Sequence, residues 1–106
     1  GLNEVAIALT LPRWALLIAS ERLSKRHLQV SVANARIVDG PGAVDAGFLD
    51  EVTPQDNVLA RALEVAQGFA EQLDRKAYAS TVRSLRGDLL NSMDAAIAAD
   101  RAAAGL

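Results

Sequence analysis

The chain has 106 residues and a formal net charge of −2, and 51% of its residues are hydrophobic while 23% are charged. These proportions are those of an ordinary globular protein, which argues against disordered and fibrous classes. Cysteine is absent, so disulfides, thiolate metal sites and a cysteine nucleophile are excluded, and a single histidine is too few for a multi-histidine metal site. The charge offers no general attraction to nucleic acid or to an anionic membrane, so we expect neither as a partner and expect a cytoplasmic protein.

Three short apolar segments are typical of strands. They are residues 5–9, the surroundings of Ile37, and residues 48–52. Helix-forming sequence separates them and none has a hairpin partner, although isolated strands cannot satisfy their own backbone groups. Either they pair in a very small sheet or the sheet that they join lies outside this chain. We favour the second interpretation, so we expect the chain to be a piece of a larger protein.

Helix signals account for most of the remaining sequence. Pro12 suits the first turn of one helix, and Ser24 suits the N-cap of the next, with His27 expected at the surface of its first turn. The glycine-proline-glycine sequence at 40–42 then breaks the chain before a short helical turn at 43–46 that Gly47 ends.

Two longer helices are expected to close the chain. Thr53 is placed to cap the first of them and Pro54 to occupy its first position. This helix carries one apolar stripe, made of Leu59, Ala62, Leu63, Ala66, Phe69, Ala70 and Leu73. The last helix covers roughly residues 78–97, with Gly87 as a weak point, and an alanine-rich tail follows it.

Two stretches of sequence resemble a known family. Residues 3–5 (NEV) with Leu11 and Pro12, then residues 43–54 (AVDAGFLDEVTP) and two closing helices, are similar to the C-terminal half of the crotonase superfamily, the enoyl-CoA hydratase/isomerase family. The resemblance covers the chain from end to end. It implies the α/β class, as a crotonase-like ββα spiral of which this chain is the mostly helical C-terminal half. It also implies two regions, residues 1–52 as part of the core and residues 53–106 as a helical oligomerisation region.

The resemblance implies chemistry on acyl-CoA thioesters. In the family a positioned carboxyl group moves a proton at the alpha carbon while two backbone N–H groups stabilise the enolate oxygen. Glu4 matches this catalytic glutamate, and Leu11, Pro12, Arg13 and Trp14 match the substrate-binding segment after it. The backbone N–H of Arg13 would contact the catalytic water of a hydratase. No cofactor and no metal are implied, because coenzyme A is part of the substrate.

The sequence also departs from the family pattern. Asn3 stands where proline commonly precedes the glutamate, Ala8 stands where glycine is usual, and residues 13–16 replace the glycine-rich turn of many hydratases. Bulky Trp14 at this position would reshape the acyl pocket. These departures weigh against water addition but not against proton transfer by a carboxylate. The second catalytic glutamate and the oxyanion amides of the family belong to its N-terminal half.

Three function classes therefore remain open. The chain is part of an acyl-CoA hydratase or isomerase, part of an acyl-CoA-binding relative without chemistry, or a small helical interaction module. For the first class we expect an acyl-CoA substrate, the N-terminal half of the fold as partner, a homo-trimer or hexamer, and no activity of this chain alone. Without the resemblance, Glu4 would be read as a solvated carboxylate near a chain end and Trp14 as a core residue.

Overall fold

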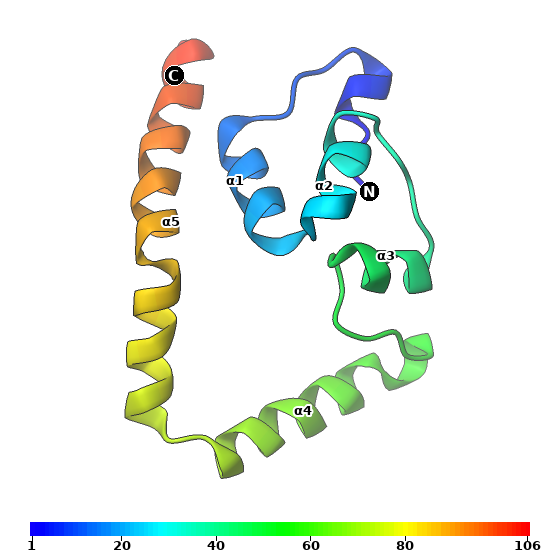
Figure 1. The fold of residues 1–106 in the computed structure, drawn as a ribbon, viewed down its shortest axis with the longest axis vertical. Coiled ribbons are helices and arrows are strands. Elements are labelled where there is room, and N and C mark those ends of the chain that lie inside the picture. The colour runs from blue at the N-terminus through cyan, green and yellow to red at the C-terminus, as the bar shows by residue number, and fades with distance from the viewer. The chain divides into compact units, whose positions relative to one another are not determined.

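The computed structural model describes all residues from 1 to 106 and consists of helices joined by irregular segments (Figure 1). Contacts divide the chain into two compact units, residues 1–52 with 89–106, and residues 53–88. The sequence predicts a division at residue 52 into a core region and an oligomerisation region. The roles of these two regions stay a prediction. By contacts, the last 18 residues group with the first unit.

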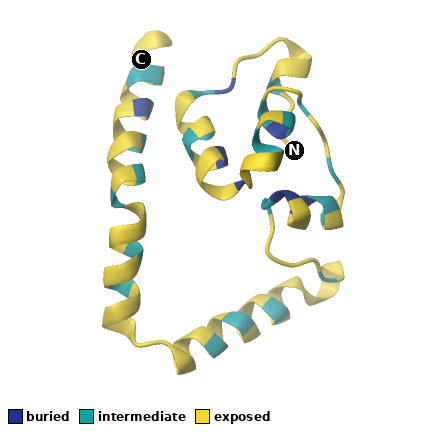
Figure 2. Cartoon of the chain, in the orientation of Figure 1, coloured by how far each residue is buried: buried dark blue, intermediate teal, exposed yellow.

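The first unit is built from four short helices and the end of a long one. It contains the 3-10 helix η1 (Glu4–Ile7), α1 (Arg13–Arg22), α2 (Lys25–Val32), α3 (Gly40–Ala46) and the C-terminal part of α5 (Arg75–Ala103). The centre of its core is small. Ala19, Leu23 and Ala46 are buried there, and Leu2, Leu28, Val32 and Phe48 pack against them. In Figure 2 the buried positions of α1 and α3 mark this core.

The helix starts follow from the local sequence, with small shifts. Pro12 is the N-cap of α1, one position earlier than predicted, because its extended backbone (ψ 150°) lies outside the helix. Ser24 is the N-cap of α2 as predicted, but its hydroxyl oxygen lies 2.8 Å from His27 Nδ1. The other ring nitrogen of His27 lies 3.1 Å from Asp45 Oδ2, and 12% of the side chain is exposed. The prediction of a surface histidine is therefore wrong, because the ring links α2 to α3.

The start and end of α3 show two capping devices. Asp39 Oδ1 accepts a hydrogen bond from the Gly42 N–H at 2.9 Å, so the helix begins at Gly40 instead of residue 43. Gly47 ends the helix in a left-handed conformation with φ 101°, as the sequence predicts.

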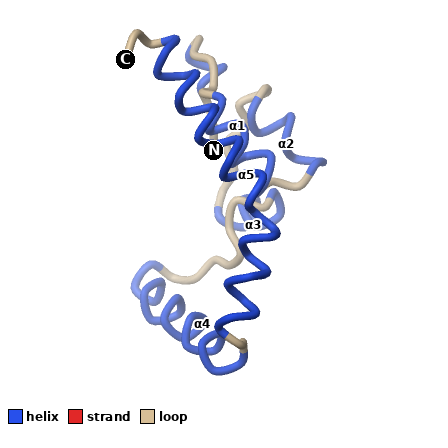
Figure 3. Tube along the Cα trace, turned by 90° about the vertical axis from the view of Figure 1, so that its left-hand side faces the viewer, coloured by secondary structure: helices blue, strands red, loops and turns tan.

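None of the three strand-like segments is a strand, and Figure 3 shows helices and loops only. Glu4–Ile7 forms a 3-10 turn, and the surroundings of Ile37 and residues 48–52 are irregular apart from a turn and bends. The physical reason is that no neighbouring strand supplies the hydrogen bonds that an extended segment needs. Ile37 remains 62% exposed and Val52 50% exposed.

The second unit contains the 3-10 helix η2 (Gln55–Asn57), α4 (Val58–Gln72) and the first turns of α5. Thr53 does not cap α4 as predicted, because its hydroxyl donates to the Pro54 carbonyl at 3.1 Å and η2 intervenes. Asp74 Oδ1 accepts from the Ala77 N–H at 2.8 Å and so caps the start of α5. That helix continues through Gly87 without interruption, so the predicted weak point does not break it.

The apolar stripe of α4 lies on the surface of this unit. Leu59 is 72% exposed and Phe69 57% exposed, and α4 contains no buried residue (Figure 2). Several large apolar side chains left uncovered on one helix are typical of a surface that contacts another protein.

Candidate functional site

Glu4 is the first residue of η1, and the backbone around it is held by hydrogen bonds. The Ala6 N–H donates to the Asn3 carbonyl at 3.0 Å, and the Leu9 N–H donates to the carbonyl of Glu4 at 2.8 Å. The side chain is half-buried, and its Oε2 atom is buried without any hydrogen-bond partner. Burying a polar oxygen without a partner costs free energy, so this atom calls for a functional explanation.

The buried carboxylate lines a pocket of about 390 Å³, which we call the glutamate pocket. Its lining consists of Leu2, Glu4, Pro12, Trp14, Ala15, Ile18, Ala19, Arg22, Leu23 and Phe48. Half of these residues lie on one face of α1, where spacings of three and four bring side chains together. The pocket therefore surrounds one carboxylate with mainly apolar groups, as small-molecule sites usually do.

One positive charge borders the glutamate pocket. Arg22 lies at the C-terminal end of α1, and its Nη2 donates to Asp50 Oδ1 at 2.7 Å. Both side chains are well exposed, so the pair contributes little stability. Its geometric effect is to connect the end of α1 to the segment after α3.

The residues predicted to bind substrate divide among three environments. Pro12 and Trp14 line the glutamate pocket with Glu4. Leu11 is only 6% exposed and lines a different pocket. Arg13 is exposed and begins α1, so its N–H is one of those that lack an acceptor within the helix. The predicted roles of all four residues remain proposals.

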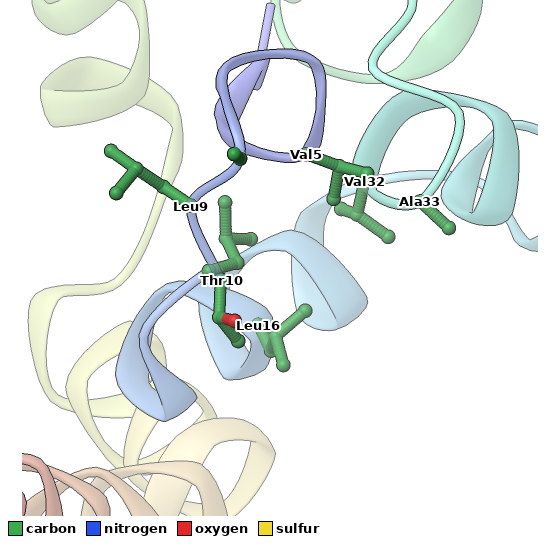
Figure 4. A pocket seen from close by; sticks show the side chains of 8 residues that line it. Val5, Leu9, Thr10, Leu16, Val32 and Ala33 are labelled. Carbon is green, nitrogen blue, oxygen red and sulfur yellow. The ribbon is translucent and has the colours of Figure 1, made fainter.

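The second pocket of this unit, of about 380 Å³, offers no acid or base (Figure 4). It is lined by Val5, Ala8, Leu9, Thr10, Leu11, Leu16, Val32 and Ala33. In Figure 4, Val5 from η1 and Val32 from α2 lie next to each other, and the hydroxyl of Thr10 is the only side-chain polar group. The glutamate pocket is therefore the better candidate for a reaction.

Several pocket residues were not identified from the sequence. Ile18 and Arg22 follow Trp14 at i+4 and i+8, so helical spacing alone places them on its face of α1. Leu2 and Phe48 come from segments 46 residues apart, and no local pattern connects them. They meet only because the fold brings the end of α3 against α1.

No group of three or more histidine, cysteine, aspartate or glutamate side chains is arranged to hold a metal ion. None of the helices combines the length and the apolar character that a membrane crossing needs.

Comparisons with known proteins give the family. No protein-family model matches the chain, and no curated protein sequence matches it significantly. Among solved structures it is similar to a probable enoyl-CoA hydratase from Mycobacterium tuberculosis H37Rv, with a TM-score of 0.89 and 38% identity over 98% of this chain and 44% of that one. A second structure of the same Mycobacterium tuberculosis protein, described there as an enoyl-CoA isomerase, gives a TM-score of 0.86 and 38% identity over 94% of this chain and 44% of that one. An enoyl-CoA hydratase/isomerase family protein from Pseudomonas syringae gives a TM-score of 0.88 and 39% identity over 95% of this chain and 44% of that one.

The matches extend over nearly all of this chain but less than half of each similar structure. A likeness of this closeness in both sequence and structure goes beyond a shared fold. The helical architecture is consistent with the C-terminal half of the crotonase-like α/β fold that the sequence predicts. The chain thus belongs to the enoyl-CoA hydratase/isomerase family within the crotonase superfamily.

Proposed function

We propose that this chain supplies the catalytic carboxylate of a protein that moves a proton at the alpha carbon of acyl-CoA thioesters. The observation that carries the proposal is the buried, unpartnered Oε2 of Glu4 in an otherwise mainly apolar pocket. A carboxylate used as a proton carrier needs a free oxygen toward the substrate, and a pocket that keeps water away. The unpartnered Oε2 of Glu4 and the mainly apolar lining of its pocket support this role.

In the proposed reaction the alpha proton moves to Glu4 Oε2. The electron pair of the broken C–H bond passes to the thioester carbonyl, which becomes an enolate. Backbone N–H groups from the N-terminal half of the family fold stabilise the enolate oxygen, and return of the proton completes exchange or isomerisation. Pro12 and Trp14 contact the acyl group, and Leu11 supports this segment from within the core. Coenzyme A enters as part of the substrate, without a separate cofactor.

Proton transfer is the step common to hydration and isomerisation, the two activities for which structures of one similar protein are named. Hydration needs an ordered water in addition, for which the Arg13 N–H at the start of α1 is the candidate donor. The replacement of a glycine-rich turn by residues 13–16 favours isomerisation over water addition. Binding of acyl-CoA without chemistry is the alternative to both.

The test is Glu4→Gln in the assembled protein, because the amide preserves shape but cannot carry the proton. We expect exchange of the alpha proton of a saturated acyl-CoA with deuterium to fall about a hundredfold to ten-thousandfold, with binding nearly unchanged. Glu21→Gln is the matched control, since Glu21 is exposed on α1 and lies outside the glutamate pocket. Exchange that survives in Glu4→Gln would refute the catalytic role. A wild-type protein that binds acyl-CoA but shows no exchange, hydration or isomerisation would support the binding-protein alternative.

We further propose that this chain works in the cytoplasm, joined to the N-terminal half of its fold and assembled as a trimer or hexamer. The support is the uncovered apolar stripe of α4, where Leu59, Leu63 and Phe69 are each more than half exposed. We expect the chain alone to be inactive and to self-associate in sedimentation experiments. A monomeric species of 106 residues that unfolds cooperatively would contradict this proposal and favour a small helical interaction module.

A further inference from the structure

Trp14 is the largest side chain in the glutamate pocket and the only tryptophan of the chain. It lies in the first turn of α1, and its backbone N–H donates to Asp100 Oδ2 of α5 at 3.4 Å. Its position is thus held by helix geometry and by a contact to a second helix. Yet 41% of the residue is exposed, so the core of this chain does not enclose the indole.

Along α1 the pocket changes from aromatic to charged. Trp14, Ile18 and Arg22 all line it at spacings of four residues. With a rise of 1.5 Å per residue, Trp14 and Arg22 are about 12 Å apart along the helix axis. The Arg22 guanidinium group and its partner Asp50 disfavour an aliphatic chain at the Arg22 end of the pocket. The apolar part of the pocket is therefore short.

We propose that Trp14 closes the apolar part of the glutamate pocket and thereby selects short acyl groups over long ones. This inference rests on the proposed function, because a carboxylate that acts at the alpha carbon places the rest of the acyl chain against residues of its own pocket. The volume of about 390 Å³ is near the lower end of the range for small-molecule sites. A chain too long for this space must displace the indole or remain in water.

The experiment measures dissociation constants of saturated acyl-CoAs with four and twelve carbons for the assembled wild-type protein and two variants. In Trp14→Ala we expect the preference for the short chain over the long one to fall at least tenfold. The reason is that one methylene group accommodated in, or excluded from, an apolar pocket changes the affinity by about tenfold or more. Leu16→Ala is the matched control, because Leu16 lies on the same helix with a similar exposure of 38% but lines the second pocket. Its preference should equal that of the wild type.

Trp14→Phe provides a second, conservative variant with an expected shift in the same direction but smaller. A preference that is unchanged in both Trp14 variants, or shifted equally in Leu16→Ala, would overturn the inference. Binding of saturated acyl-CoA does not require proton transfer, so this binding measurement can succeed or fail independently of the exchange test of Glu4. Glu4-dependent exchange with an unchanged chain-length preference would remove only the role of Trp14. A shifted preference without Glu4-dependent exchange would remove only the proposed reaction.

Discussion

Gly47 is the position at which a single methyl group should do the most damage, and we expect Gly47→Ala to destabilise the protein by about 3 kcal/mol. Its φ of 101° lies in the left-handed region, where a residue with a Cβ atom pays roughly 1–2 kcal/mol. A Cβ atom built there would lie 2.8 Å from the Arg22 carbonyl oxygen and 3.3 Å from Leu23 Cα. Both neighbours are backbone atoms of the α1–α2 junction, so relief requires α3 to move, which adds a comparable cost.

The damage should reach the candidate site. Phe48, the residue after Gly47, lines the glutamate pocket, and the Ala46 carbonyl accepts from the Ser24 N–H at 3.0 Å. A displaced α3 therefore loses a hydrogen bond and shifts one wall of the pocket. We expect weaker acyl-CoA binding in Gly47→Ala as well as a lower free energy of unfolding.

The assay is urea unfolding of the assembled protein, with Gly68→Ala as the control. Gly68 lies inside α4 with no atom within 4 Å of a built Cβ, so alanine there should stabilise by about 0.5–1 kcal/mol. If Gly47→Ala loses less than about 1 kcal/mol, the argument from backbone clash and left-handed geometry is refuted.

Two further substitutions test local backbone arguments, each by the shift of the urea midpoint. Ala8 has a φ of 60°, so Ala8→Gly should stabilise by up to about 1 kcal/mol, and a clear loss of stability would contradict the left-handed strain. Asp39→Ala removes the acceptor of the Gly42 N–H and should cost about 1 kcal/mol, whereas Asp39→Asn should retain most of the stability. Equal losses in the two Asp39 variants would mean that charge, not the cap hydrogen bond, stabilises α3.

Helix ends were predictable where one residue type determines the local backbone. Ser24 and Gly47 occupy the predicted cap positions, and Gly47 does so in the left-handed conformation that favours glycine. The Ser24 hydroxyl makes no cap hydrogen bond and contacts His27 Nδ1 instead. Thr53 does not cap α4, because its hydroxyl donates to the Pro54 carbonyl and η2 lies between the two. The prediction of three strand-like segments is wrong for a different reason, because a strand depends on a partner strand that the local sequence does not contain.

The candidate site was predictable only in part. The resemblance identified Glu4, and helical spacing from Trp14 leads to Ile18 and Arg22. Asp50 binds Arg22 across 28 residues of sequence, a contact that no local pattern indicates. Leu2 and Phe48 complete the pocket through tertiary contacts with no counterpart in the sequence pattern.

The unpartnered oxygen of Glu4 and the uncovered stripe of α4 are two costs of different kinds. Exposure of Leu59, Leu63 and Phe69 to water is unfavourable for as long as these side chains are uncovered, so a permanent protein contact would remove this cost. An unpartnered carboxylate oxygen is costly only until a hydrogen or a donor reaches it, and a permanent partner would abolish its use as a proton carrier. On the proposed function, we therefore expect a lasting partner for α4 and a transient one, the substrate, for Glu4.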